Sequence, residues 1–313
     1  MTALVLPLLI TLVAPLGFAI WLASPANATR LDCVLLSIAA VLFTVYGFVI
    51  GPVWGWIGMP WRWLPVAGLG IGFVIMLRRW PSLPAFPAGG LRACKSVLIK
   101  VFLVLVFGFQ FALVSLGYRS SEGAIDLATP LAAGRYLVIN GGRSPLINAH
   151  YGVQAQRFAL DIVALGAYGQ RAEGFAPDGL TAYDVYGRSV LAPCSGQVLA
   201  THDSAPDTPI GGNHPQAPAG NFVTLGCQID EASVTVLLAH LIPGSVVVSV
   251  GAEVTRGTVL GKVGSSGNSS EPHLHIHAVR GTVTDQTELL FTGDPIPLRI
   301  DGQVLRRNSI LSQ

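Results

Sequence analysis

Charged residues are almost absent from the first quarter of the chain, and this constrains its folding more than any other feature. Between residues 1 and 77, only Arg30, Asp32 and Arg62 are charged. About 20 consecutive apolar residues are enough to cross the hydrocarbon core of a membrane. Four apolar runs are predicted to span a membrane as helices: 3–23, 33–50, 64–77 and 96–116. The chain therefore begins with an α-helical transmembrane region over residues 1–117.

The third and the first run differ from the others in length or in their flanking residues. The run at 64–77 is short, and the sequence GPVWGWIGMPWRWLP around its start is rich in the aromatic residues typical of a membrane interface. No Lys or Arg precedes the run at 3–23, whereas a cleaved signal peptide begins with basic residues. We therefore expect the first run to be retained as a membrane span.

Basic residues between the third and fourth runs predict the orientation of the membrane region. The loop carries four of them and no acid: Arg78, Arg79, Arg92 and Lys95. Such loops stay preferentially in the cytoplasm, so the part of the chain after Tyr118 is expected outside it. The runs contain no acidic residue or histidine that would indicate a proton or ion pathway. The helices are therefore expected to anchor the protein in the lipid bilayer.

Composition changes sharply after the last run. Residues 118–313 contain all seven histidines, with 12 basic and 16 acidic side chains, a net charge of −4. This balance argues against nucleic acid as a partner, because phosphate binding needs a basic surface. Short alternating runs between Gly/Pro-rich turns predict an all-β sandwich or barrel. The expected strands are 136–140, 157–162, 189–191, 196–200, 221–225, 234–240, 246–250, 258–263 and 273–277.

Three histidines at alternate positions stand out in the sequence GKVGSSGNSSEPHLHIHAV, residues 261–279. Successive side chains of a strand point to opposite faces, so His273, His275 and His277 would share one face. Leu274 and Ile276 would then point into a core. Three imidazoles on one face indicate metal binding, acid–base chemistry or both. The alternative is a solvated strand that binds metal adventitiously.

An acid and two cysteines complete the candidate residues. Asp161 lies in the apolar stretch RFALDIVAL, where a buried carboxylate is costly unless it is paired or bound to a metal. A salt bridge to Arg157 is the alternative to a metal. Cys194 and Cys227 lie near predicted strands and would be able to form a disulfide in an oxidising compartment. The sequence does not give their separation, so both states stay open.

Several motifs together resemble lysostaphin/LytM-type zinc endopeptidases, which cut peptide bonds of bacterial peptidoglycan. The segment GAEVTRGTVLGKVGSSGNSSEPHLHIHAV resembles the C-terminal signature of that family, and LLAHL resembles a second one. VLAPCSGQV and AGNFVTLG resemble two core strands. The resemblance runs over roughly residues 148–279. It implies a lysostaphin-like sandwich or barrel of the duplicated-hybrid-motif type, with the metallopeptidase domain at 148–290, a lead-in at 118–147 and a C-terminal extension at 291–313.

The resemblance also implies roles for individual residues. His275 and Asp161 match zinc ligands, with one Zn²⁺ per chain, and His240 and His273 match two catalytic histidines. The position of His277 is usually taken by Glu or another residue in the family. We therefore expect His277 to contact a metal ligand on the side away from the metal, without binding the metal itself.

One position departs from the family pattern. The family carries its first ligand, a histidine, four residues before the aspartate, and Arg157 occupies that position here. A guanidinium cannot bind zinc, so His150 is expected to be the third ligand instead. Arg157 is then expected to lie near the metal site, within reach of a ligand, without binding the metal itself.

The resulting expectation is a zinc metalloendopeptidase in the bacterial cytoplasmic membrane, with its catalytic domain in the periplasm or outside the cell. Its zinc-bound water would hydrolyse peptide bonds of peptidoglycan. The first alternative is a degenerate, metal-free domain that binds or activates other wall hydrolases. The second is zinc-dependent cleavage of a peptide outside the wall. The cleaved bond, a regulatory protein partner and the oligomeric state are not predicted.

Overall fold

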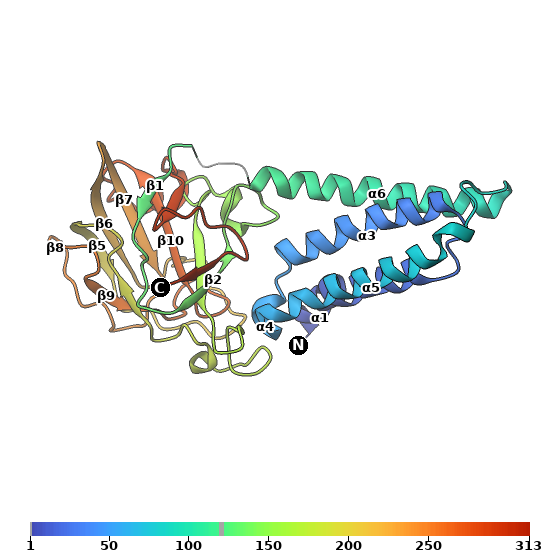
Figure 1. Cartoon of the computed structure of the whole chain (residues 1–313). Helices are drawn as coiled ribbons and strands as arrows, with labels where there is room; N and C mark the ends of the chain where they lie inside the picture. The colour runs from blue at the N-terminus through green and yellow to red at the C-terminus, as the bar shows by residue number, and fades with distance from the viewer. Residues whose placement is uncertain (1, 119–121) are drawn as a thin grey trace. The chain divides into compact units, whose positions relative to one another are not determined.

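The computed structural model describes residues 2–118 and 122–313 (Figure 1). The chain forms two compact units, Met1–Leu116 and Gly117–Gln313, each with its own core of buried apolar side chains. Residues 119–121 of the predicted lead-in lie outside the described residues.

The first unit is entirely helical, because its long apolar runs must satisfy their backbone polar groups internally. Its longer helices lie lengthwise beside one another (Figure 1). The elements are α1 (Thr2–Leu8), the π-helical turn η1 (Leu9–Val13), α2 (Ala14–Ala23), α3 (Arg30–Ile50), α4 (Trp54–Ile57), η2 (Met59–Arg62), α5 (Trp63–Arg79), η3 (Trp80–Ser82) and α6 (Leu91–Gly117).

Four of these stretches are long and apolar enough to cross a membrane: Val5–Ala23, Arg30–Ile50, Met59–Ser82 and Cys94–Gly117. The predicted set of four apolar helices is confirmed. The third is longer than the predicted 64–77, because the aromatic sequence before it and the basic residues after it are also helical.

A buried ion pair joins two helices of this unit. Asp32 lies in the first turn of α3, and its carboxylate accepts a hydrogen bond from the Lys100 ammonium of α6 at 2.6 Å. Ser96 donates to the same carboxylate oxygen at 3.2 Å. Both charged side chains are almost fully buried. The sequence pattern shows each charge alone, whereas the helix packing brings them together.

The second unit is built from β-strands around one main sheet (Figure 1). The strands are β1 (Ile125–Leu127), β2 (Arg135–Asn140), β3 (Leu160–Ala164), β4 (Ser189–Leu191), β5 (Gly196–His202), β6 (Phe222–Ile229), β7 (Ala232–Ala239), β8 (Glu253–Val254), β9 (Val259–Lys262), β10 (Leu274–Arg280), β11 (Leu298–Ile300) and β12 (Ile310–Ser312). The main sheet has the order β12-β2-β3-β10-β7-β6-β5-β8, and all its neighbours are antiparallel. Strands β4 and β9 form an antiparallel pair, and β1 and β11 a parallel one.

The two ends of this unit are part of the same fold. Strand β1 pairs with β11, and β2 pairs with β12. The lead-in and the C-terminal extension expected from the sequence therefore contact each other: β12 and β2 form one end of the main sheet, and β1 and β11 form a separate two-stranded sheet.

One predicted strand, 246–250, is wrong. In this stretch Val247 N donates to Leu260 O at 3.0 Å, but no ladder of paired residues follows. The alternation of its valines has a different cause, because Val246 and Val248 pack against the core of the unit.

The two faces of the main sheet differ in character. Leu274 and Ile276 of β10 point into the large core, as predicted from the alternation. The opposite face of β10 carries His275 and His277, with Val279 farther along in a smaller apolar cluster. Period-two alternation thus separates a dry core from a face that carries imidazoles.

Candidate metal centre

Asp161 and His275 form the centre of the histidine cluster. They lie directly opposite each other on neighbouring antiparallel strands, β3 and β10. Side chains of such cross-strand pairs share one face and lie within contact distance. Oδ1 of Asp161 is 2.9 Å from Nδ1 of His275, and both side chains are 4% exposed. The sheet register therefore brings a carboxylate and an imidazole together from positions 114 residues apart.

His150 reaches the same carboxylate from a turn. It lies in the 3₁₀ turn η4 (Ala149–Gly152), and Asn148 Oδ1 accepts its backbone N–H at 3.0 Å. The buried Asn148 amide donates to the carbonyl oxygens of Arg157 and Ala159, just before β3. These bonds tie the turn to the start of the strand. Nε2 of His150 consequently lies 2.8 Å from Oδ2 of Asp161.

A chain of hydrogen bonds from His275 through His277 to Leu289 shows which ring nitrogen of His275 carries the proton. Nε2 of His277 faces the carbonyl oxygen of Leu289 at 2.9 Å, and a carbonyl only accepts. His277 therefore carries its proton on Nε2, and its Nδ1 accepts. That nitrogen is 2.9 Å from Nε2 of His275, which must be the donor. The lone pair of His275 is thus on Nδ1, toward Asp161.

The same reasoning applies to His150. The Gln156 side chain hydrogen bonds to His150, and its amide nitrogen donates to the Leu290 carbonyl at 2.8 Å. The amide oxygen remains to accept a proton from the imidazole. In the neutral ring, Nε2 of His150 then presents its lone pair to Asp161.

These lone pairs fit a metal ion. His150, Asp161 and His275 offer one ligand atom each, all within 4.8 Å of one another. An imidazole lone pair that faces a carboxylate oxygen has no proton between the two acceptors, whereas a cation between them satisfies both. Two nitrogens and one oxygen are a common ligand set of catalytic zinc, with one coordination position left open.

Burial shapes the protonation of the imidazoles in this cluster. Burial and the neighbouring imidazoles hold the pKa of His240 well below its usual value. Burial also lowers the pKa of His275 to about 4 and that of His277 to about 3. All three rings are therefore neutral near pH 7; the lone pair of His277 accepts the N–H of His275, whereas those of His240 and His275 stay open for a proton or a metal.

The carboxylate behaves differently from these rings. Burial by itself would raise the pKa of Asp161, but the nearby imidazoles of His150 and His273 hold it well below its usual value. Burial opposes the charge on His150 as well, yet the Asp161 carboxylate raises the pKa of that imidazole. Asp161 therefore keeps its negative charge at neutral pH.

The other two predicted histidines, His240 and His273, lie beside each other with ring centroids 4.6 Å apart. His240 follows β7 with a φ of +67°, a left-handed conformation that is uncommon outside glycine. Its Nδ1 donates to the carbonyl of Ser266 at 2.8 Å, within the Gly/Ser turn. Nδ1 of His273 donates to the carbonyl of Glu271 at 2.8 Å. Each ring is thereby held with Nε2 available for a proton.

Arg157 is not part of the cluster. Within the described part of the chain no ion pair joins it to Asp161, whose ionic neighbours are histidines. Its guanidinium lies 5.6 Å from the centre of the Tyr151 ring. The predicted strand 157–162 begins only at Leu160, so Arg157 lies in the preceding turn and does not share a strand face with Asp161. The salt-bridge alternative is wrong for this reason.

The two cysteines of the unit are joined. Cys194 and Cys227 form a disulfide between the segment before β5 and the strand β6. Both are buried in the main core, away from the histidine face of the sheet. The bridge therefore contributes to the scaffold.

Several residues around the cluster have no sequence signal that identifies them. Asn140, at the end of β2, donates to Oδ2 of Asp161 at 2.9 Å. Gln156 and Asn148 orient His150, and the Leu289 carbonyl orients His277. Amides and a backbone carbonyl are too common in sequences to be picked out by pattern. Only the fold reveals these contacts.

A cleft of about 350 Å³ opens over the cluster. His150, His240 and His275 line one part of it. Apolar side chains line another part, among them Leu290 and Phe291 of the π-helical turn η6 (Glu288–Thr292). Clefts of this size with a few convergent polar groups are typical of small-ligand and peptide sites.

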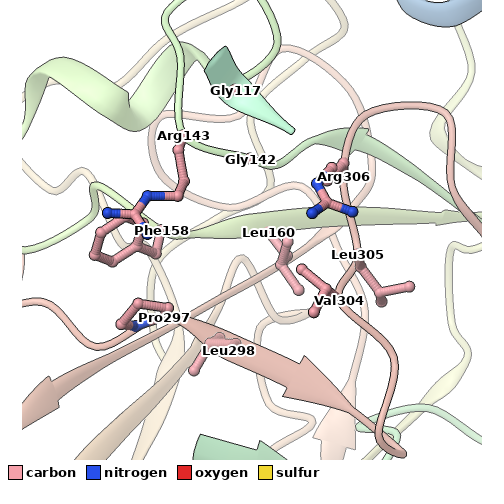
Figure 2. A pocket seen from close by; sticks show the side chains of 10 residues that line it. All are labelled: Gly117, Gly142, Arg143, Phe158, Leu160, Pro297, Leu298, Val304, Leu305 and Arg306. Carbon is pink, nitrogen blue, oxygen red and sulfur yellow. The ribbon is translucent and has the colours of Figure 1, made fainter. Parts of the chain in front are cut away.

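A second hollow of the same unit is much smaller. Figure 2 shows it beside Arg143, whose guanidinium lies 5.3 Å from the centre of the Phe158 ring, and beside Arg306. Its volume is about 10 Å³, the space of roughly one water molecule. It has no room for a peptide.

A family model described as peptidase family M23 matches residues 178–286. The matched segment contains His240, His273 and His275, whereas His150 and Asp161 precede it. No curated protein sequence matches the chain.

Similar solved structures include a zinc-containing peptidase from Vibrio cholerae, with 20% identity, a TM-score of 0.25, and 37% of this chain and 26% of that chain covered. A putative peptidase M23 from Pseudomonas aeruginosa has 19% identity, a TM-score of 0.28, and coverage of 61% and 57%. The catalytic domain of lysostaphin from Staphylococcus simulans has 23% identity, a TM-score of 0.23, and coverage of 36% and 79%. This chain thus spans less than two thirds of the first two. Likeness at this level says nothing of what this chain does.

Proposed function

We propose that the peptidase family M23 domain at residues 178–286, completed by His150 and Asp161, makes this chain a membrane-anchored zinc metalloendopeptidase that cuts peptide bonds of bacterial peptidoglycan. One observation carries the proposal. The hydrogen-bond partners of His150 and His275 leave a lone pair on each ring aimed at the same carboxylate. A charged carboxylate between two lone pairs is a cation site.

His150, Asp161 and His275 would hold one Zn²⁺ per chain. When bound, zinc supplies a Lewis acid that polarises a carbonyl and acidifies water. Asn140 would hold the carboxylate in place through its bond to Oδ2. His277 and Gln156 would keep the two imidazoles in the tautomers that bind metal.

The two remaining histidines supply proton transfer. His240 is neutral near pH 7, and its Nδ1–H is held by the Ser266 carbonyl, so Nε2 is ready to take a proton from the attacking water. Nε2 of His273 points into the cluster, 3.6 Å from Oδ1 of Asp161. Because the Glu271 carbonyl holds the proton on Nδ1, Nε2 would first have to take up a proton before it can donate one to the oxyanion that develops on the scissile carbonyl.

The compartment supports this substrate. The basic residues at the end of α5 (Arg78 and Arg79) and at the start of α6 (Arg92 and Lys95) favour retention of the segment between the two helices in the cytoplasm. The β unit would then lie on the other side of the membrane, where peptidoglycan is found. The disulfide of Cys194 and Cys227 agrees with this assignment, because disulfides persist in oxidising compartments.

Thiol labelling tests the orientation. Cys94 is exposed and lies near the start of α6, between Arg92 and Lys95. In spheroplasts, a membrane-impermeant maleimide is expected to leave Cys94 unlabelled until the membrane is broken. A Tyr168→Cys variant, at a side chain that is 81% exposed in the β unit, should label at once. Immediate labelling of Cys94 would reverse the orientation.

Metal content and cleavage test the activity. The full chain in detergent should hold about one zinc per chain and release peptide fragments from purified sacculi. His150→Ala should lose the metal and the cleavage together, whereas Arg157→Ala, in the adjoining turn, should keep both. A folded protein that holds no zinc when offered the metal would favour the metal-free scaffold. Bound zinc without cleavage of sacculi would favour a peptide substrate outside the wall.

A further inference from the structure

We infer that the turn η6 and the neighbouring Val153 form an apolar subsite that holds a small, uncharged aliphatic side chain of the substrate peptide beside the bond that is cut. This inference rests on the proposed function for the presence of a peptide in the cleft. It adds the chemical class of one substrate residue and names Phe291 as the residue that selects it.

The backbone of the turn is held from both sides. The carbonyls of Leu290 and Thr292 accept bonds from the side-chain amides of Gln156 and Gln154, each at 2.8 Å. The Phe291 carbonyl accepts the N–H of Ala155 at 3.3 Å. On the other side, the Leu289 carbonyl accepts the bond from His277. The turn is therefore a fixed wall, joined to the residues that orient the two candidate histidine ligands.

The wall presents apolar surface to the cleft. Val153, Leu290 and Phe291 line it together with Leu237 and Pro218. Leu237 and Leu290 belong to a buried apolar cluster, whereas the Phe291 side chain is 46% exposed. A large aromatic ring left open at the edge of a buried cluster is available to cover an apolar group of a ligand.

Within the described residues, the part of the cleft beside Phe291 offers no partner to a charged side chain. The lining residues that the structure describes include imidazoles and the amides of Gln156 and Asn268, but no Lys, Arg, Asp or Glu. An ionised side chain placed against Phe291 would lose hydration without gaining a partner. A volume of about 350 Å³ lies near the lower end of peptide and small-ligand sites, which favours small side chains. Together these features select a short aliphatic residue.

This subsite belongs to the chain's own extensions of the matched family segment. The turn η6 begins at Glu288, after the last matched residue, and Val153 lies before the first. The wall is thus built by residues that the family model does not include.

Cleavage specificity tests the inference with the full chain. The bond cut in purified sacculi is first identified by mass spectrometry. Peptides are then made with alanine, valine, glutamate or lysine at the residue next to that bond. The native protein should prefer alanine or valine, and Phe291→Ala should raise KM for those peptides about tenfold with kcat little changed. Phe291→Glu should shift the preference toward the lysine peptide.

Phe175→Ala is the matched control, because that side chain is also 46% exposed but does not line the cleft. Zinc content and thermal melting verify that every variant is folded. Peptide binding is measured in parallel by calorimetry. If cleavage proceeds with the same KM and preference in both Phe291 variants, the subsite is wrong and the proposed function stands. If no sacculus bond is cut but binding of an alanine-rich peptide depends on Phe291, the proposed function is wrong, and Phe291 forms an apolar subsite of a peptide-binding cleft instead. If neither cleavage nor binding depends on Phe291, the inference is overturned.

Discussion

Replacement of His277 by phenylalanine should weaken zinc binding although His277 is not itself a ligand. The buried His277 ring joins the Leu289 carbonyl to Nε2 of His275 through two contacts of 2.9 Å. A phenyl ring of similar size keeps the packing and removes both hydrogen bonds. His275 then loses the acceptor that places its proton on Nε2. The tautomer with the proton on Nδ1 becomes accessible, and that proton competes with the metal for Asp161.

The size of the effect follows from these two contacts. Loss of a bond behind a metal ligand typically costs about 10–100-fold in metal affinity, which corresponds to about 1.4–2.7 kcal/mol. The N–H of His275 and the Leu289 carbonyl also become buried without partners, at about 1–3 kcal/mol of unfolding free energy each. His277→Phe should therefore bind zinc about 10–100-fold more weakly and melt at a lower temperature in the metal-free state.

The assay is competition for zinc against a chromophoric chelator at fixed pH, with the full chain in detergent. His202→Phe is the matched control, because Nδ1 of His202 also bonds a carbonyl, that of Gly220, but outside the cluster. His277→Gln should recover part of the affinity, since an amide can both accept from His275 and donate to Leu289. A zinc Kd for His277→Phe within twofold of the native value would refute the tautomer argument. So would an equal loss in His202→Phe.

Three further predictions concern other parts of the molecule. Lys100→Met should lower the melting temperature in detergent, because breaking a buried ion pair costs about 3–5 kcal/mol of stability. The double variant Lys100→Met/Asp32→Asn should recover much of that stability. Equal melting temperatures of the single and double variants would contradict this. Burial raises the pKa of Tyr183 and Tyr186 to about 12, so the folded protein keeps both phenols protonated at pH values where the unfolded chain ionises them. The contribution of the two phenols to folding stability is therefore intact below about pH 10 and should be lost as the pH rises toward 12. Tyrosinate absorbance checks this, and complete ionisation of all tyrosines near pH 10 in the folded protein would contradict it. His240→Ala should retain zinc but lose about 10²–10⁴-fold in kcat, and a native rate would remove it from catalysis.

The membrane helices and the alternating histidines follow from local patterns. A run of apolar residues is long enough to span a bilayer or it is not, and this depends only on neighbouring residues. Period-two alternation likewise assigns the faces of β10, as Leu274 and Ile276 in the core confirm. The same rule failed at residues 246–250, because alternation records which side chains pack inward and not whether the backbone pairs in a ladder.

Contacts between distant segments were decided only by the tertiary structure. His150 meets Asp161 because the Asn148 amide ties a turn to the start of β3, and no spacing in the chain encodes that bond. The pairing of Asp32 with Lys100, 68 residues apart, depends on helix packing in the same way.

The sequence by itself therefore determined the four apolar helices and the β-rich character of the second unit, because both depend on residue types and on short-range periodicity. The candidate ligands and catalytic histidines were expected from the resemblance of its motifs to those of a known family. The tertiary structure decided which nitrogen of His275 faces Asp161, and which wall closes the cleft. The first depends on the Leu289 carbonyl beyond His277, and the second on the amides of Gln154 and Gln156, which donate to the carbonyls on either side of Phe291. Both depend on hydrogen bonds to backbone carbonyls, which every residue carries, so their partners are set only when the chain folds.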